Sequence, residues 1–245
     1  MKQLLALAAL CMGWPAGASA VEPQRPADAA PDPRGNTNPY SGVVLNDPGF
    51  LGAHPDLRWR GEALHALENG RPDEAFGYFR RASRFADKPS QAMVAEMLWT
   101  GTGVPRDRPQ AYAWMDIAAE RAYVPFVSKR EEYWEALDEA GRERALEVGR
   151  PLYEEYRDAV AQERLERKLE KAKRKITGSR VGFVGFLKVV VAGPGGIGIA
   201  IDGERFYDDK YWEPDLYWAW QDSIWQDPPT GTVSVEPLEV VREDD

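Results

Sequence analysis

The side chains that most often perform chemistry are scarce in this sequence. The chain has two histidines, His54 and His65, and a single cysteine, Cys11, so nothing further is present to complete a zinc site. No serine stands in a G-x-S-x-G motif, and a catalytic triad would have to recruit one of the two histidines. The sequence therefore predicts no metal and no cofactor, and it favours a protein that is not an enzyme.

One glycine-rich stretch, Gly193-Pro194-Gly195-Gly196-Ile197-Gly198, superficially resembles a phosphate-binding loop. Such a loop needs a following helix, whose N-terminus faces the phosphate. The residues that follow, IAIDGERFY, have the pattern of a strand, so we predict a turn between two strands instead. Among 40 acidic residues some pair always looks catalytic, so no carboxylate pair is singled out here.

Aromatic residues crowd into a short segment near the C-terminus. Between residues 207 and 225 lie Trp212, Trp218, Trp220 and Trp225, together with Tyr207, Tyr211 and Tyr217. Aromatic rings in that number can stack on sugars or receive an extended peptide. They can equally form the core of a small domain that has few aliphatic residues. The sequence leaves both interpretations open.

The first twenty residues, MKQLLALAALCMGWPAGASA, are typical of a secretory signal peptide. Lys2 supplies the positive charge, an apolar stretch follows it, and Ala18-Ser19-Ala20 forms a cleavage site of small residues. We therefore expect cleavage after Ala20 and a periplasmic or secreted protein. Bulky Leu10 precedes Cys11 where a lipoprotein needs a small residue, so acylation is not predicted. The mature chain then has no cysteine, which excludes disulfides and thiol chemistry.

The formal net charge is −9, and it becomes −10 when Lys2 leaves with the signal peptide. Such an acidic chain argues against general nucleic-acid binding. Residues 164–180 hold eight Lys and Arg against two acids, whereas residues 202–245 hold thirteen acids against three basic residues. The two segments either face each other or form separate solvated surfaces.

Helical periodicity begins near Asp56, and glycine turns divide it into repeating units. Each unit has a helix, a turn and a second helix, as in DLRWRGEALHALENG followed by PDEAFGYFRRASRFA. The residues of the second helix recur 36 positions later, so that Ala75, Tyr78, Phe79 and Ala82 correspond to Ala111, Trp114, Met115 and Ala118. A period in the mid-thirties with two helices per unit indicates a helical repeat array.

The second unit carries a more specific pattern, G-x-G-V-x-x-D-x-x-x-A-x-x-W-x-x-x-A-A. Its glycines close one helix, its aspartate is placed to cap the next, and its alanines let paired helices approach closely. The residues concerned are Gly101, Gly103, Asp107, Ala111, Trp114, Ala118 and Ala119. This pattern resembles the signature of Sel1-like repeats, which are relatives of tetratricopeptide repeats. The resemblance covers residues 56–125 and implies an α-solenoid that contacts other proteins and is not a catalyst.

The resemblance also implies where a partner would bind. In tetratricopeptide-like arrays the first helix of each unit lines the concave face, which exposes the positions two and five before the closing glycine. These positions are His65 and Glu68 in the first unit, and Glu96 and Trp99 in the second. Their carboxylates favour a basic or amide-rich ligand, with Trp99 as the anchor. The alternative is that all four are ordinary surface residues of a short stack.

We expect a mainly α protein, a short α-solenoid of about two helix pairs plus closing helices, with a small C-terminal α+β element. The expected segments are the signal peptide at 1–20, a Pro-rich disordered or extended leader at 21–55, the repeats at 56–125, closing helices and a charged helix at 126–178, and the β-containing element at 179–245. The charged helix is expected to continue the second closing helix. The apolar residues expected to close the array are Tyr133, Trp134, Leu137, Leu146, Leu152, Tyr153 and Tyr156.

Within the C-terminal element, residues 181–201 are apolar but interrupted by Lys188 and several glycines. This favours a buried hairpin over a stable membrane span. The segment PDLYWAWQDSIW predicts a short helix, and GTVSVEPLEVV predicts a last strand.

Three functional hypotheses follow. The first is an exported, non-catalytic interaction module that binds a protein or peptide in the bacterial cell envelope. The alternative is a cell-wall glycan binder that uses the tryptophan-rich segment on peptidoglycan. The third is an envelope hydrolase.

Overall fold

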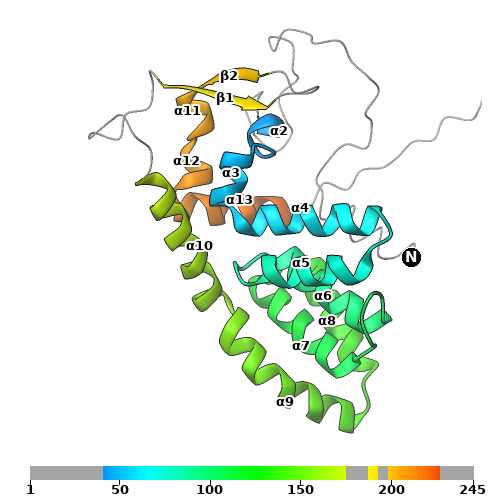
Figure 1. Ribbon diagram of the computed structural model, residues 1–245. Coiled ribbons are helices and arrows are strands. Elements are labelled where there is room, and N and C mark those ends of the chain that lie inside the picture. Colours follow the sequence, from blue (N-terminus) through cyan, green and yellow to red (C-terminus); the bar gives the residue numbers. More distant parts are fainter. Residues whose placement is uncertain (1–40, 175–186, 193–197, 227–245) are drawn as a thin grey trace, which may run out of the picture.

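The structure is a computed structural model, and residues 41–174, 187–192 and 198–226 are described (Figure 1). The predicted signal peptide with its cleavage site lies outside these residues. So do residues 21–40 of the predicted leader and the predicted last strand at residues 231–241.

The chain is mainly helical, and its central helices form a stack. The first pair is α4 (Pro55–Glu68) with α5 (Pro72–Ser83), and the second is α6 (Lys88–Thr100) with α7 (Arg108–Ala118). A 3-10 helix, η2 (Ala119–Arg121), leads into α8 (Val124–Glu135) and then α9 (Glu139–Tyr156). Both α8 and α9 pack on α7 and so close the array. The predicted α-solenoid is confirmed.

Local sequence signals start and stop these helices. A proline occupies the first turn of α4, α5, α6, α7 and α8, where its missing N–H has no helical acceptor. The Asp87 carboxylate accepts from the Ser90 N–H at 3.2 Å, and Asp107 accepts from the Gln110 N–H at 3.0 Å. At the other end of α6, Gly101 adopts a φ of 79°, a left-handed conformation that favours glycine.

The second glycine of the signature, Gly103, is required by a tertiary contact as well as by its backbone conformation. Gly103 has a φ of 74°, and a Cβ built on it would lie 2.5 Å from the carbonyl carbon and oxygen of Pro72. The loop at residues 101–107 therefore presses directly on the first turn of α5. Only glycine satisfies both the backbone conformation and the close approach.

The alanines and tryptophan of the signature form the centre of the core. Ala111, Ala118 and Ala119 are buried, which allows α6 and α7 to lie close together. Trp114 is also buried, and its ring centroid lies 4.5 Å from that of Tyr156 in α9. These residues therefore join the second repeat to the closing helices.

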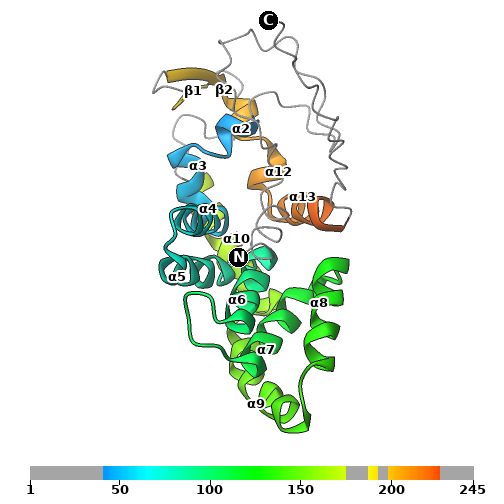
Figure 2. The same ribbon diagram turned by 90° about the vertical axis from the view of Figure 1, so that its right-hand side faces the viewer.

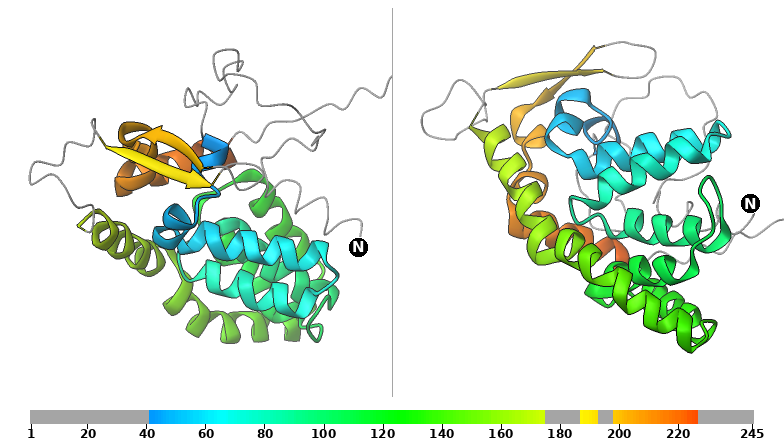
Figure 3. Two further views of the ribbon diagram at one scale, coloured as in Figure 1. Left: turned by 45° about the horizontal axis from the view of Figure 1, so that its top comes forward. Right: turned by 60° about the horizontal axis from the view of Figure 1, so that its bottom comes forward.

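The prediction for the closing helices is wrong at two residues. Leu146 is 58% exposed and Tyr153 is 42% exposed, because α9 turns Ala145, Leu152 and Tyr156 toward the array instead. The charged helix α10 (Asp158–Lys173) also does not continue α9. Arg157 between them has an extended backbone, with ψ at 155°, so the chain changes direction there (Figure 3).

The predicted leader is also wrong from residue 41 onward. Residues Ser41–Val44 form α2 and Pro48–Ala53 form α3, and Val44 and Phe50 are fully buried. They share a core with residues nearly 150 positions away in the sequence, among them Val191, Ile201 and Phe206. The apolar residues of this proline-rich stretch gain burial only against the C-terminal element.

The C-terminal element contains the predicted hairpin and helix, but the hairpin is not buried as predicted, because only one of its faces packs on the core and Val190 is 70% exposed. Strands β1 (Lys188–Ala192) and β2 (Gly198–Asp202) pair antiparallel, with Val190 opposite Ala200, and they lie over α2 and α11 (Figure 3). The short helices α11 (Gly203–Phe206) and α12 (Asp209–Trp212) lead into α13 (Pro214–Gln226). Helix α13 lies beside α8 on one side of the array, and α5 lies on the other (Figure 2).

Candidate protein-binding surface

The residues predicted to face a partner lie on the last turns of α4 and α6, the first helices of their repeats. His65 and Glu68 are exposed on α4. The Asn69 side-chain amide donates to the His65 carbonyl oxygen at 2.7 Å, and the same amide nitrogen lies 3.2 Å from Nε2 of the His65 ring. The His65 ring is thereby held beside the end of the helix, and Glu68 is open to solvent.

Glu96 differs from the prediction, because it is only 3% exposed. The Tyr133 hydroxyl of α8 donates a hydrogen bond to its Oε2. Desolvation, together with the hydrogen bond to Glu96, raises the pKa of Tyr133, so this hydroxyl keeps its proton. Helix α8 therefore covers Glu96, and the predicted carboxylate is not available to a partner.

Trp99 is half-buried and lies in a stack of rings and cations. Its ring and that of Tyr133 are parallel within 4°, with centroids 3.9 Å apart. The Arg108 guanidinium carbon lies 4.7 Å from the Trp99 centroid, and the Lys129 ammonium lies 5.7 Å from the Tyr133 centroid. Such contacts hold the Trp99 side chain in one position while part of it stays exposed. The sequence analysis did not place Arg108, Lys129 or Tyr133 beside Trp99, because they belong to α7 and α8 and not to α6.

Helix α13 contacts the first turns of α4 and α8. Tyr217 donates a hydrogen bond to the Asp56 carboxylate in the first turn of α4. Trp225 approaches Phe126 in the first turn of α8, with centroids 5.5 Å apart. Helix α13 therefore covers the N-terminal turns of α4 and α8, whereas the predicted positions lie at the C-terminal turns of α4 and α6.

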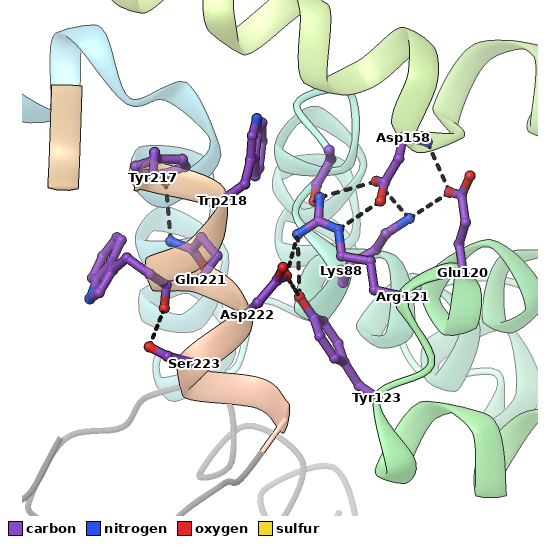
Figure 4. Close-up of polar contacts among 12 residues, drawn as sticks. Lys88, Glu120, Arg121, Tyr123, Asp158, Tyr217, Trp218, Gln221, Asp222 and Ser223 are labelled. Carbon is purple, nitrogen blue, oxygen red and sulfur yellow. Dashed lines mark hydrogen bonds and ion pairs between the residues drawn. The ribbon is translucent and has the colours of Figure 1, made fainter. Parts of the chain in front are cut away.

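A buried polar network fastens α13 and α10 to the repeats (Figure 4). The Lys88 ammonium, fully buried at the start of α6, contacts the Ile117 carbonyl at 2.8 Å, Glu120 at 2.9 Å and Asp158 at 2.9 Å. The Arg121 Nε donates to Asp158 at 2.6 Å.

Two further contacts extend this network to α13 (Figure 4). The Tyr123 hydroxyl donates to Asp222, and the Arg121 guanidinium lies 3.7 Å from the same carboxylate. Because the charges are paired and hydrogen-bonded, the network defines the position of α13 and α10 relative to the repeats.

Asp56 and His54 are buried titratable residues next to this network. Desolvation and the charge of Asp87 raise the pKa of Asp56 to about 7, against the opposing effects of Tyr217 and Arg60. Burial lowers the pKa of His54, whose ring nitrogens lie 2.9 Å from the Phe50 carbonyl oxygen and 2.8 Å from that of Tyr211. Both ring nitrogens face backbone carbonyl oxygens, the neutral ring donates its single N–H to one of them at a time, and His54 joins α3 to α12. Within the described residues no group of His, Cys, Asp and Glu is arranged to hold a metal ion.

The tryptophan-rich segment divides into two kinds of residue. Trp212 is 5% exposed and Trp225 is 3% exposed, so both belong to the core. Trp218 and Trp220 are half-buried. The Trp218 indole N–H donates to Glu166 of α10 at 3.0 Å. A sugar could therefore reach only Trp218 and Trp220 of the four tryptophans considered for glycan binding.

Within the described parts of the oppositely charged segments, an ion pair joins Lys173 of α10 to Glu213 before α13. Other basic residues of α10 pair within the helix, as Arg167 does with Glu163. No helix in the described ranges is long and apolar enough to cross a membrane. Residues 193–197 of the glycine-rich stretch lie outside the description, and strand β2, not a helix, follows them.

Stacked helix pairs closed by glycine turns define an α-solenoid repeat protein. The sequence matches the Sel1 repeat model at residues 66–84 and 88–123, which span α5 and the segment from α6 to the start of α8. These two segments of the chain are therefore Sel1 repeats, as the glycine and alanine signature predicts.

Among solved structures, the chain is similar to a protective antigen present in uropathogenic Escherichia coli strains that displays an SLR fold. The two are 23% identical with a TM-score of 0.39, and the match covers 46% of this chain and 25% of that one. The sequence has no match among curated proteins.

Proposed function

We propose that this protein is an exported, non-catalytic adaptor of the bacterial cell envelope that binds a protein or peptide partner. Sel1 repeats indicate a protein-interaction module. The pattern of residues 1–20 supports export. The observation that carries the proposal is the rigid, partly exposed Trp99 stack, which lies at the end of α6 away from the turns that α13 contacts.

The placement of the reactive side chains supports a non-catalytic role. His54 uses both ring nitrogens on backbone carbonyls, and Asp56 is bonded to Tyr217 in the core. The exposed His65 lies beside the Asn69 amide, which is neither a nucleophile nor an acid. His54 and Asp56 thus contribute to packing in the core, and His65 lies at a helix end.

The geometry also refines the partner chemistry. Because Glu96 is buried, Glu68 is the predicted carboxylate that a basic or amide group could meet. Arg108 and Lys129 flank the Trp99 stack with positive charge. We therefore expect the partner to place an aromatic or amide side chain beside Trp99 and a basic group near Glu68.

The test is capture of the partner from envelope extract, its identification by mass spectrometry, and titration of the purified partner. Trp99→Ala should weaken binding by about 30-fold, the size of a hot-spot residue. Trp59→Ala is the matched control, because Trp59 is also half-buried, stacked on a tyrosine (Tyr78) and covered by an arginine, Arg81. Equal loss in both variants would indicate a folding defect and not a binding site.

The glycan alternative makes a different prediction. Trp218→Ala with Trp220→Ala should then abolish saturable pelleting with purified peptidoglycan, while Trp99→Ala leaves pelleting unchanged. That result, together with no captured protein, would replace the adaptor proposal. Turnover of the peptidoglycan would instead indicate the hydrolase.

Export is tested on the native protein by mass spectrometry. We expect Val21 as the first residue of the mature chain. Retention of residues 1–20 would contradict export, and a fatty-acyl mass on Cys11 would indicate a lipoprotein.

A further inference from the structure

A hollow of about 360 Å³ is lined by residues of the repeats and of α9. It lies between α5, the loop at residues 101–107, α7 and α9. Its apolar lining comes from Phe76, Leu98, Val104, Pro105, Trp114 and Leu152. We call it the outer hollow. The outer hollow is distinct from the Trp99 stack, because its lining includes neither Trp99 nor Tyr133.

Two arginines line the outer hollow, Arg80 from α5 and Arg106 from the loop. Both are exposed, and neither has a carboxylate partner among the residues that the structure describes. The one acid of the lining, Asp107, caps α7 and lies 3.3 Å from Arg144. In a chain of net charge −9, two such arginines beside an apolar hollow select a ligand that combines an apolar side chain with carboxylates.

We infer that the outer hollow binds a segment of the chain's own C-terminus, residues 236–241, of sequence EPLEVV. In this segment Leu238 stands between Glu236 and Glu239, so an apolar side chain is flanked by two carboxylates. That order matches an apolar hollow with two arginines on its edge. Pro237 favours an extended backbone at this point, which suits a segment laid across a groove.

The length of the chain allows this docking within one molecule. Helix α13 ends at Gln226, and Leu238 lies twelve residues further on. Twelve extended residues span up to about 40 Å. Helices α8 and α7 lie between α13 and the outer hollow. Packed helices lie about 8–10 Å apart, so the straight-line distance is about 20–30 Å, and the longer path around these helices takes up most of the remaining reach.

Disulfide trapping tests this inference, because the chain has no cysteine other than Cys11. In the full chain with Cys11→Ala, we combine Gln110→Cys in the lining of the outer hollow with Leu238→Cys. Gln110 is partly exposed, so its replacement should be tolerated. We expect an intrachain disulfide to form under mild oxidation. The control pairs Leu238→Cys with Glu62→Cys, an exposed site on α4 outside the outer hollow.

Charge reversal separates recognition from chance encounter. Arg80→Glu with Arg106→Glu should slow trapping about tenfold, and added Glu236→Lys with Glu239→Lys should restore it. Circular dichroism and the melting temperature establish that each variant is folded. Equal trapping at the control site, or no effect of charge reversal, would overturn the inference. A disulfide formed only between two chains would also overturn it, because the segment would then occupy a second copy.

Discussion

The buried carboxyl of Asp56 leads to a quantitative prediction about pH. In the folded protein its pKa is raised from 3.8 to about 7, chiefly by desolvation. A folded-state pKa above the unfolded value means that folding retains a proton which the unfolded chain releases. The stabilisation from this proton is therefore complete below about pH 4 and is lost as the pH rises through 7.

The shift sets the size of the effect. About three pH units at 1.36 kcal/mol each correspond to about 4 kcal/mol between pH 4 and pH 8. Asp56→Asn removes the titration while keeping an amide oxygen that can accept from Tyr217. The difference in unfolding free energy between wild type and Asp56→Asn should thus change by about 4 kcal/mol over this range.

The assay is urea unfolding followed by tryptophan fluorescence at several pH values between 4 and 8.5. His54 has a lowered pKa, so its contribution has the opposite pH dependence and is lost as the pH falls. It is present in both proteins and cancels in the difference. The control is Asp73→Asn, which removes an exposed carboxylate of α5. A difference in unfolding free energy between wild type and Asp56→Asn that stays constant with pH would refute the reasoning.

Three further predictions concern packing. Gly103→Ala should destabilise by about 2–4 kcal/mol, because its positive φ and the close Pro72 backbone both oppose a Cβ; Gly77→Ala, in open space within α5, should instead be neutral or stabilising. Ala118→Leu should lower stability by about 1–3 kcal/mol through overpacking, and an unchanged melting temperature would show that the repeat register is wrong. Lys88→Ala should cost about 1.5–3 kcal/mol by removing the buried cation between Glu120 and Asp158, although Asp158 keeps its pairing with Arg121, and a loss under 1 kcal/mol in denaturant unfolding would contradict this.

The repeat architecture follows from the sequence by itself, because its signals act over short distances. A left-handed backbone at Gly101 and a cap at Asp107 are each decided within a few residues, and the close packing at Ala111 and Ala118 joins helices that follow one another in the sequence. The hairpin and helix α13 are likewise visible as local changes of periodicity. These elements could be predicted with their approximate boundaries.

The candidate surface was only partly predictable. The resemblance to known repeats correctly directs attention to the last turns of α4 and α6. It does not predict that Glu96 is buried by a hydrogen bond from Tyr133, which lies 37 positions away on another helix. The side chains that rigidify Trp99 belong to α7 and α8. The periodicity of one helix shows which of its faces is apolar, but it does not show which neighbouring helix covers a given turn.

Contacts between distant residues decided the rest. His54 meets the carbonyl oxygen of Tyr211 across 157 positions, and Asp56 meets Tyr217 across 161. Residues 41–53 therefore become helical and buried only because the C-terminal element offers them an apolar face. The sequence alone determined a stack of helices with its caps and turns. The tertiary structure decided that α3 and α13 both pack at the start of α4. Burial of such scattered apolar and polar groups depends on partners that no local pattern identifies.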